Sequence, residues 1–312
     1  MRQIHFAGGE HAVLLLHGLM SSPLEMQYLS KRFQRAGLVT RVPHLVGYGF
    51  AQPSERFVPR TWQQWHAQVL DHFDAMKREY RTVSVCGLCI GAVLALNLAA
   101  ERRAEVSALS LLATTLAFDG WSIPWYRFLA PLAFHTPLRH LYAYREREPF
   151  GFKNEAVRKW IAREMAEKAN SAAGAASLPM TAVYQAHKLI KHVRRALPRV
   201  GAPTLVMHAW EDDVASPKSA EFVVKHIGTR DVRLSLLHDS YHIISMDNEK
   251  QKVADETLRF FGERAGVTTA TLEQGGMGRY PAVNDVAAVR IGGFARAPDS
   301  DAQLAAWRGK GL

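Results

Sequence analysis

Cys89 stands at the centre of the sequence Gly87-Leu88-Cys89-Ile90-Gly91, between a β-branched run and an apolar helix-like run. In a nucleophile elbow, the residue between two glycines lies on a sharp strand-to-helix turn that exposes its side chain above a sheet. Glycines are needed because the two backbones approach closely in this turn. The start of the helix also stabilises negative charge on the exposed side chain. The motif therefore predicts that Cys89 is a nucleophile.

Such a nucleophile needs a histidine base and a carboxylate that orients the histidine, in the chain order nucleophile, acid, base. His242 is the expected base because it lies in a loop after the last predicted strand. The acid is expected in the sequence WEDDV after the preceding strand, with Asp212 as first choice, Asp213 as second and Glu211 as third. We therefore predict a catalytic triad of Cys89, His242 and Asp212.

Stabilising the oxyanion of an acyl-transfer reaction requires two backbone N–H donors aimed at the reacting carbonyl oxygen. Ile90 follows the nucleophile and is expected to supply one of them. Leu19 is expected to supply the other, because it belongs to a His17-Gly18-Leu19 turn at the end of the first apolar strand.

The chain has two cysteines, too few for a disulfide scaffold and without the second pair that a zinc site would need. Their Cys-x-x-Cys spacing allows a redox pair in principle. However, Cys86 is expected on a strand facing the interior and Cys89 on the turn, so the two sulfurs need not meet. We predict neither a metal nor a cofactor.

Strand-like and helix-like segments alternate around these residues, the pattern of a parallel sheet covered by helices on both faces. The predicted strands cover residues 11–16, 38–43, 81–86, 106–113, 203–209 and 232–237. The predicted helices cover residues 21–36, 61–80, 90–100, 217–226 and 248–261. The nucleophile, the acid and the base each follow one of the strands.

The alternation stops in the middle of the chain, which indicates an insertion into one sheet. Residues 1–114 and 201–264 are predicted to form the core, and residues 115–200 an inserted helical cap, or lid. The insertion begins with an aromatic, proline-punctuated stretch and continues as two amphipathic helices. Residues 265–312 are rich in glycine and are expected to form a C-terminal extension that is poorly ordered.

Five sequence stretches carry a resemblance to a known superfamily: LLLHGLMSSP, PHLVGYG, VCGLCIGAVLAL, HAWEDDVASP and HDSYHIISMD. The chain resembles the α/β-hydrolases from residue 11 to about residue 262, and is similar to bacterial carboxylesterases and monoacylglycerol lipases. The resemblance implies an α/β-hydrolase fold, with a mostly parallel, doubly wound sheet and an inserted helical cap. It also implies an enzyme that acts on ester or thioester bonds.

The chain departs from these esterases at Cys89, where they carry serine. Natural cysteine versions occur in dienelactone hydrolases and polyhydroxyalkanoate synthases, and an engineered replacement of serine would give the same sequence. Because sulfur is a strong nucleophile, we predict an acyl hydrolase, a carboxylesterase or thioesterase, that forms a covalent thioester. An acyltransferase using the same triad is the first alternative. A non-enzymatic binding module on a degenerate hydrolase fold is the second.

Aromatic side chains of the insertion are expected to line an apolar cleft above the nucleophile. Trp121, Trp125, Phe128 and Phe134 are the predicted substrate-binding residues. The expected substrate is a small-molecule ester or thioester with a hydrophobic acyl group.

The chain carries a net charge of +10, and residues 139–200 hold 13 Lys or Arg against 5 Glu and no Asp. This basic region favours an acyl carrier protein, a CoA-linked substrate or peripheral contact with an anionic membrane. Nucleic acid is disfavoured because no recognised binding motif accompanies the charge. No apolar run is long enough to span a membrane, and the first residues do not resemble a secretory signal, so we expect a cytoplasmic protein.

Overall fold

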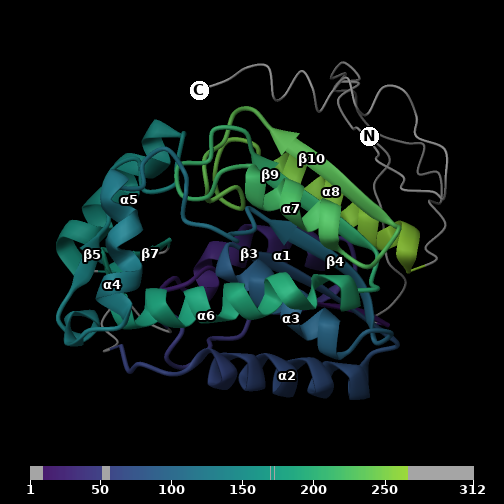
Figure 1. The fold of residues 1–312 in the computed structure, drawn as a ribbon. Coiled ribbons are helices and arrows are strands. Elements are labelled where there is room, and N and C mark those ends of the chain that lie inside the picture. Colours follow the sequence, from purple (N-terminus) through teal and green to yellow (C-terminus); the bar gives the residue numbers. More distant parts are fainter. Residues whose placement is uncertain (1–9, 51–56, 169, 172, 266–312) are drawn as a thin grey trace, which may run out of the picture.

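The computed structural model describes residues 10–50, 57–168, 170–171 and 173–265 (Figure 1). A sheet of six parallel strands lies at its centre, in the order β10-β9-β4-β3-β1-β2. The strands are β1 (His11–Leu16), β2 (Val39–Arg41), β3 (Thr82–Leu88), β4 (Val106–Leu112), β9 (Thr204–Ala209) and β10 (Val232–Leu237). The predicted α/β-hydrolase fold with a parallel sheet is confirmed.

Helices cover both faces of this sheet, because successive side chains of each strand point to opposite faces. Leu14 and Leu16 of β1 pack toward a layer of four helices: α2 (Trp62–Glu79), α3 (Ile90–Glu101), α6 (Met180–Ala196) and α7 (Lys218–His226). Val13 and Leu15 pack toward α1 (Gln27–Arg35) and α8 (Lys250–Arg264) on the other face. Every residue of β1 is buried, as expected for a strand covered on both sides.

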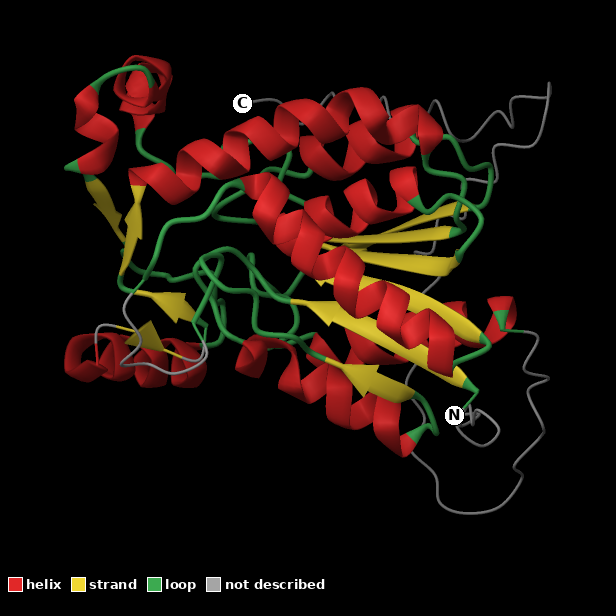
Figure 2. Ribbon diagram, turned by 90° about the horizontal axis from the view of Figure 1, so that it is seen from below, coloured by secondary structure: helices red, strands yellow, loops and turns green. Residues whose placement is uncertain are grey.

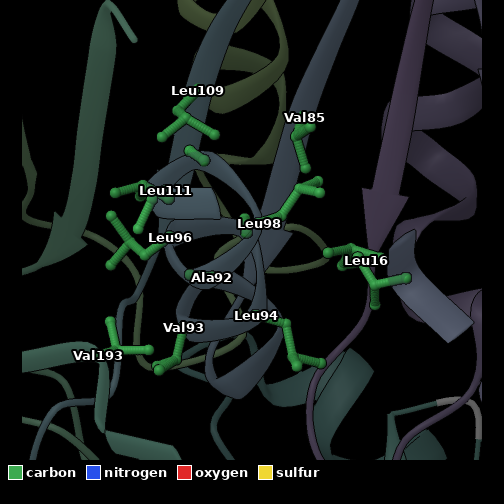
Figure 3. Packing of buried hydrophobic residues seen from close by; sticks show 14 of the residues in the cluster. Leu16, Val85, Ala92, Val93, Leu94, Leu96, Leu98, Leu109, Leu111 and Val193 are labelled. Carbon is green, nitrogen blue, oxygen red and sulfur yellow. The ribbon is translucent and has the colours of Figure 1, made fainter. Parts of the chain in front are cut away.

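Helix α3 is the centre of the larger core, and Figure 3 shows its side chains between the sheet and α6. Val93 and Leu96 belong to α3, Val85 and Leu111 come from the sheet, and Val193 comes from α6. Eleven of the twelve residues of α3 are buried. A helix that is apolar on nearly every side is stable only in such a position, and its N-terminus is therefore held firmly at the end of β3.

Two predicted boundaries differ from the structure near the site. The helix expected over residues 21–36 starts as a short 3₁₀ helix, η1 (Pro23–Met26), capped by the side chain of Ser22, before α1 begins. The strand expected over residues 81–86 continues to Leu88, so that only Cys89 separates it from α3. The turn is thus as tight as the elbow motif requires.

The chain between β4 and β9 leaves the sheet and returns to it. It forms η2 (Trp125–Leu129), α4 (Ala130–Phe134), η3 (Pro137–His140), β5 (Ala143–Arg145), α5 (Glu155–Lys168), β6 (Asn170–Ser171), β7 (Gly174–Ala175), β8 (Ser177–Pro179), α6 and η4 (Leu197–Arg199). The elements from η2 to β8 lie beyond the ends of the strands (Figure 2). Helix α6 instead buries Leu189 and Val193 in the main core beside α3.

Because of this packing, we assign α6 to the helical layer of the core and place the cap before it, within residues 115–179. The C-terminal extension expected from residue 265 lies outside the described residues, apart from Ala265 itself. Within the described parts of the chain, no helix is both long and apolar enough to cross a bilayer.

Candidate active site

Cys89 occupies a strained backbone conformation between β3 and α3. Its φ of 58° and ψ of −121° lie outside the ordinary regions for a residue with a side chain. The flanking glycines make this turn possible: a Cβ on Gly87 would collide with the backbone of Gly91, and a Cβ on Gly91 would collide with the carbonyl oxygens of Leu16 and His17. Strain of about 1–3 kcal/mol persists only where the surroundings enforce it, and it is typical of functional sites.

The structure brings His242 and Asp212 together from the loops after β10 and β9. The Nδ1–H of His242 donates to the two carboxylate oxygens of Asp212 at 2.9 and 2.8 Å. Both side chains are buried. The same Asp212 carboxylate accepts the backbone N–H groups of Val214 and Ala215 at 2.9 and 2.8 Å, which fix its orientation. Asp212, the first choice from the sequence, is therefore the acid of the WEDDV sequence that contacts the ring.

The other nitrogen of the ring, Nε2, is buried and makes no well-aligned hydrogen bond with the described part of the chain. Cys89 and His242 line the same pocket. Burial alone would lower the pKa of His242, but the Asp212 carboxylate and the Cys89 sulfur outweigh burial and raise that pKa well above its usual value. Burial would raise the pKa of Asp212, whereas the neighbouring His242 lowers it. The site thus stabilises the positive charge that the imidazole gains when it takes a proton.

The remaining acids of the WEDDV sequence have different positions. Asp213 is buried and accepts the backbone N–H groups of His242 at 3.2 Å and Gly151 at 3.1 Å. Burial raises its pKa to about 6. Glu211 is directed outward, where it pairs with Lys153 at 2.5 Å. Asp213 therefore supports the loop that carries His242, while Glu211 belongs to the surface.

The expected oxyanion donors come from the loop after β1 and from the start of α3. Leu19 belongs to the loop after β1 and lines the pocket together with Cys89. Tyr48 holds this loop from both ends, because its hydroxyl donates to the carbonyl of His17 at 2.9 Å and its carbonyl accepts the N–H of Met20 at 2.9 Å. Ile90 is the first residue of α3, so its N–H has no acceptor within the helix.

Thr115 and Glu25 are neighbours of Cys89, and sequence reasoning identified neither of them. The hydroxyl of Thr115, which follows β4, lies 3.4 Å from the sulfur of Cys89 and can donate to it. Glu25 is buried in η1 and accepts the N–H of Gly18 at 2.6 Å. Their signal is weak, because a threonine after a strand and a glutamate in a helix are ordinary in sequence.

Glu146 is a third residue that sequence reasoning missed. It follows β5 in the cap, lines the pocket with Glu25, and lies close enough to Asp213 and His242 to interact with both charges. Burial raises the pKa of Glu25 to about 7 and the pKa of Glu146 to about 7. Near neutral pH the pocket therefore contains two carboxyl groups that are only partly ionised.

The rest of the pocket wall is mainly apolar. It encloses about 660 Å³ of empty space, including its open mouth. Phe118, Phe150, Met165, Leu178 and Ile243 are its larger apolar side chains. Met165 and Leu178 belong to α5 and β8, so the cap closes the side of the pocket that faces away from the sheet.

The four aromatic residues predicted to bind substrate are elsewhere, and this expectation needs correction. Trp125 and Phe128 are 81% and 65% exposed. Trp121 donates its indole N–H to the loop after β9, and Phe134 is buried against aromatic rings of α6. The physical reason is that η2 and α4 lie at the outer edge of the cap, while α5, β7 and β8 cover the pocket.

Two further expectations concern Cys86 and the basic region. Cys86 is a free, buried thiol of β3, and burial raises its pKa to about 12.

The positive charge expected on the cap is divided between helices. Lys159 and Arg163 are exposed on α5, whereas Arg194 and Arg195 are exposed in the last turn of α6, beyond the cap. Among the described residues, no group of three or more His, Cys, Asp or Glu side chains is arranged to hold a metal ion.

Comparison with known proteins agrees with this geometry. A protein-family model described as serine aminopeptidase, S33 (Hydrolase_4) matches residues 9–249. A thermostable monoacylglycerol lipase from Bacillus sp. (strain H-257) is 27% identical over 83% of this chain and 93% of its own length. A carboxylesterase from Bacillus subtilis (strain 168) is 24% identical over 82% of this chain and 94% of its own.

Among solved structures, a soluble variant of monoglyceride lipase from Saccharomyces cerevisiae, in complex with a substrate analog, superposes with a TM-score of 0.67. The alignment covers 83% of this chain and 88% of the yeast chain, at 14% identity. At that identity the likeness concerns the fold.

Proposed function

The chain belongs to the serine aminopeptidase S33 family of α/β-hydrolases, and from this premise we propose that it hydrolyses carboxylic esters through Cys89, His242 and Asp212. The carrying observation is the position of three side chains after three strands, in the order nucleophile, acid, base. The relatives that are lipases and esterases support an ester as the substrate.

The proposed reaction begins when His242 Nε2 takes the proton of the Cys89 thiol and the sulfur attacks the ester carbonyl. The carbonyl oxygen becomes negative and accepts the N–H groups of Leu19 and Ile90. When the carbon–oxygen bond to the alcohol breaks, His242 gives its proton to the departing oxygen, leaving a thioester on Cys89. Water then loses a proton to His242 and attacks the thioester. The acid departs, and the sulfur recovers its proton.

Asp212 acts through His242 in this scheme. Its hydrogen bond to Nδ1 keeps Nε2 directed at the sulfur, and its charge stabilises the imidazolium that forms in each half-reaction. The short distance between these buried groups strengthens the interaction, because the surroundings screen charge weakly.

The pocket supports an apolar acyl group as the part of the substrate that the enzyme binds. Phe118, Phe150 and Met165 provide apolar contact area. Glu25 and Glu146 carry less negative charge near neutral pH than ordinary carboxylates, because burial raises their pKa values to about 7. An apolar pocket whose described lining residues include no lysine or arginine favours a fatty or aromatic acyl chain over an anionic one.

Acyl transfer is the second candidate, and the cysteine favours it. A thioester is attacked readily by amines, thiols and alcohols, so an acceptor that enters the pocket could replace water. Thioesters of CoA or of a carrier protein should be tried as acyl donors, since the exposed basic residues of α5 would attract their negative charge. The rate of free-acid release, measured with and without an added acceptor, separates the two activities. A hydrolase releases free acid at a rate that the acceptor does not change.

The decisive experiment combines ester turnover with intact-mass measurement. We expect the wild-type protein to acquire the mass of one acyl group from an activated short-chain ester and then lose it in water. Cys89→Ala should abolish the adduct and lower kcat/KM by at least about a thousandfold. Cys86→Ala is the matched control, because that thiol is buried and unreactive.

Two results would contradict the proposal. Undiminished turnover by Cys89→Ala would exclude the nucleophile. Absence of both adduct and turnover in the wild-type protein, over a panel of acyl chain lengths, would favour a binding module on a degenerate hydrolase fold.

A further inference from the structure

The cap carries a patch of large apolar side chains that no described residue covers. Its members are large apolar side chains of η2, α4 and the turn before β5, namely Trp125, Tyr126, Phe128, Leu129, Leu132, Leu141 and Tyr142, all of which are exposed. Trp125 and Leu141 are 81% and 82% exposed. Soluble proteins rarely leave apolar side chains of this size together in water, and such patches mark interaction sites.

Contacts join four of these residues directly. The Trp125 ring lies 6.0 Å from the Tyr126 ring and 6.0 Å from the Phe128 ring. The hydroxyl groups of Tyr126 and Tyr142 hydrogen bond to each other, which joins η2 to the segment before β5. Helix α4 and strand β5, within and beside the segment that carries the patch, lie at the outer end of the cap, away from the central sheet (Figures 1 and 2).

Within residues 120–145 the charged side chains are all arginines. Residues 120–145 contain no Asp or Glu, while Arg127, Arg139 and Arg145 lie among or beside the apolar side chains. Arg127 and Arg145 are exposed, and Arg139 is half-buried over the Tyr184 ring. Exposed tryptophan and tyrosine combined with arginine is the composition of protein surfaces that lie in the interfacial region of membranes.

We propose that this patch docks on an anionic lipid surface, with Trp125, Phe128, Leu132 and Leu141 entering the interface and Arg127 and Arg145 contacting the headgroups. Charge complementarity selects this partner over a second copy of the chain, because two copies would bring the same arginines together. The docking depends on the surface alone and goes beyond the proposed reaction.

The position of the patch gives the docking a consequence for the pocket. The segment that carries it starts shortly after Phe118 and ends just before Glu146, and both of these residues line the pocket around Cys89. A lipid surface bound there would contact the segment of chain that connects these two walls of the pocket. The protein would then take its substrate from a lipid phase.

The test is co-sedimentation of the full chain with vesicles of phosphatidylcholine alone and of phosphatidylcholine with 30% (about one lipid in three) phosphatidylglycerol. We expect binding to the anionic vesicles to be at least about tenfold tighter than to the neutral ones, because each arginine near an anionic surface contributes about fivefold. The double variant Trp125→Ser/Phe128→Ser should lose at least about tenfold in binding. Thermal unfolding of this double variant checks that it is folded, independently of any enzyme activity.

A charge-matched pair of variants separates local from overall electrostatics. Arg127→Glu/Arg145→Glu should weaken binding to the anionic vesicles, whereas Arg78→Glu/Arg103→Glu, which makes the same change in net charge outside the cap, should bind nearly as the wild type does. Equal losses in the two pairs would overturn the proposal. So would failure of the wild type to sediment with anionic vesicles, or self-association that the Trp125→Ser/Phe128→Ser variant abolishes.

Discussion

Replacing Glu25 with glutamine tests the electrostatics of the pocket directly. The residue is 2% exposed, and burial raises the pKa of its carboxyl group from 4.5 to about 7. The same carboxyl accepts the N–H of Gly18. Groups near it are His242, whose positive charge opposes the shift, the buried Tyr48, and Cys89, which lines the same pocket. Glutamine keeps an oxygen that can accept the Gly18 N–H, but it cannot ionise.

The direction of the effect follows from comparing the folded and unfolded chains. Between pH 4.5 and about 7, the unfolded chain loses the Glu25 proton while the folded chain retains it. Ionisation of Glu25 therefore favours the unfolded chain. Below about pH 4.5 it does not reduce the unfolding free energy of the wild type, and above about pH 7 the reduction is complete. At about 1.4 kcal/mol per pH unit, the total loss of unfolding free energy is about 3 kcal/mol.

The assay is urea unfolding of the wild type and of Glu25→Gln at pH 5 and pH 8, at equal ionic strength. Asp213 and Glu146 also titrate in this range, so the quantity to compare is the difference between the two proteins at each pH. We expect that difference to move by about 2 to 3 kcal/mol in favour of Glu25→Gln between pH 5 and pH 8. Glu105→Gln, at an exposed turn, is the control. If the unfolding free energies of the wild type and of Glu25→Gln changed by the same amount between pH 5 and pH 8, the reasoning would be refuted.

Two substitutions test the other parts of the site. Asp212→Asn removes the charge that orients His242, so kcat for ester hydrolysis should fall by about four orders of magnitude; steady-state rates within tenfold of the wild type would exclude Asp212 as the triad acid. Gly91→Ala places a methyl group against backbone carbonyls and should lower the thermal unfolding temperature by several degrees or prevent folding. Gly201→Ala is its control, since no atom lies within 4 Å of the new Cβ, and equal unfolding temperatures for the two variants would contradict the steric argument.

The sequence predicts the positions of Cys89, Asp212 and His242 because each position is a local property of the chain. Each residue directly follows a buried strand or lies in the loop after one, and parallel strands bring their carboxyl ends to one edge of the sheet. The apolar runs that mark those strands are short and unmistakable. Their order along the chain then assigns the roles of acid and base, and the structure places Asp212 and His242 in direct contact.

The walls of the pocket could not be predicted in the same way. Glu25 and Glu146 are acids in amphipathic or irregular segments, where the expected place of a carboxylate is the surface. They are buried because η1 and the cap fold over Cys89, and no short sequence pattern predicts that arrangement. The same limit explains the error over Trp125 and Phe128: aromatic composition indicates an apolar surface, but it does not say which way that surface faces.

The outward direction of those aromatic residues links the two proposals. A soluble short-chain ester can reach Cys89 without a lipid surface, so its hydrolysis measures the triad and the pocket alone. A long-chain ester held in vesicles requires the pocket and the patch together. The Trp125→Ser/Phe128→Ser variant should therefore keep its rate on the soluble ester and lose rate on the vesicle-bound ester, because neither side chain lines the pocket. Equal loss on both substrates would mean that these aromatic residues act on the pocket after all, through the chain that connects them to Phe118 and Glu146.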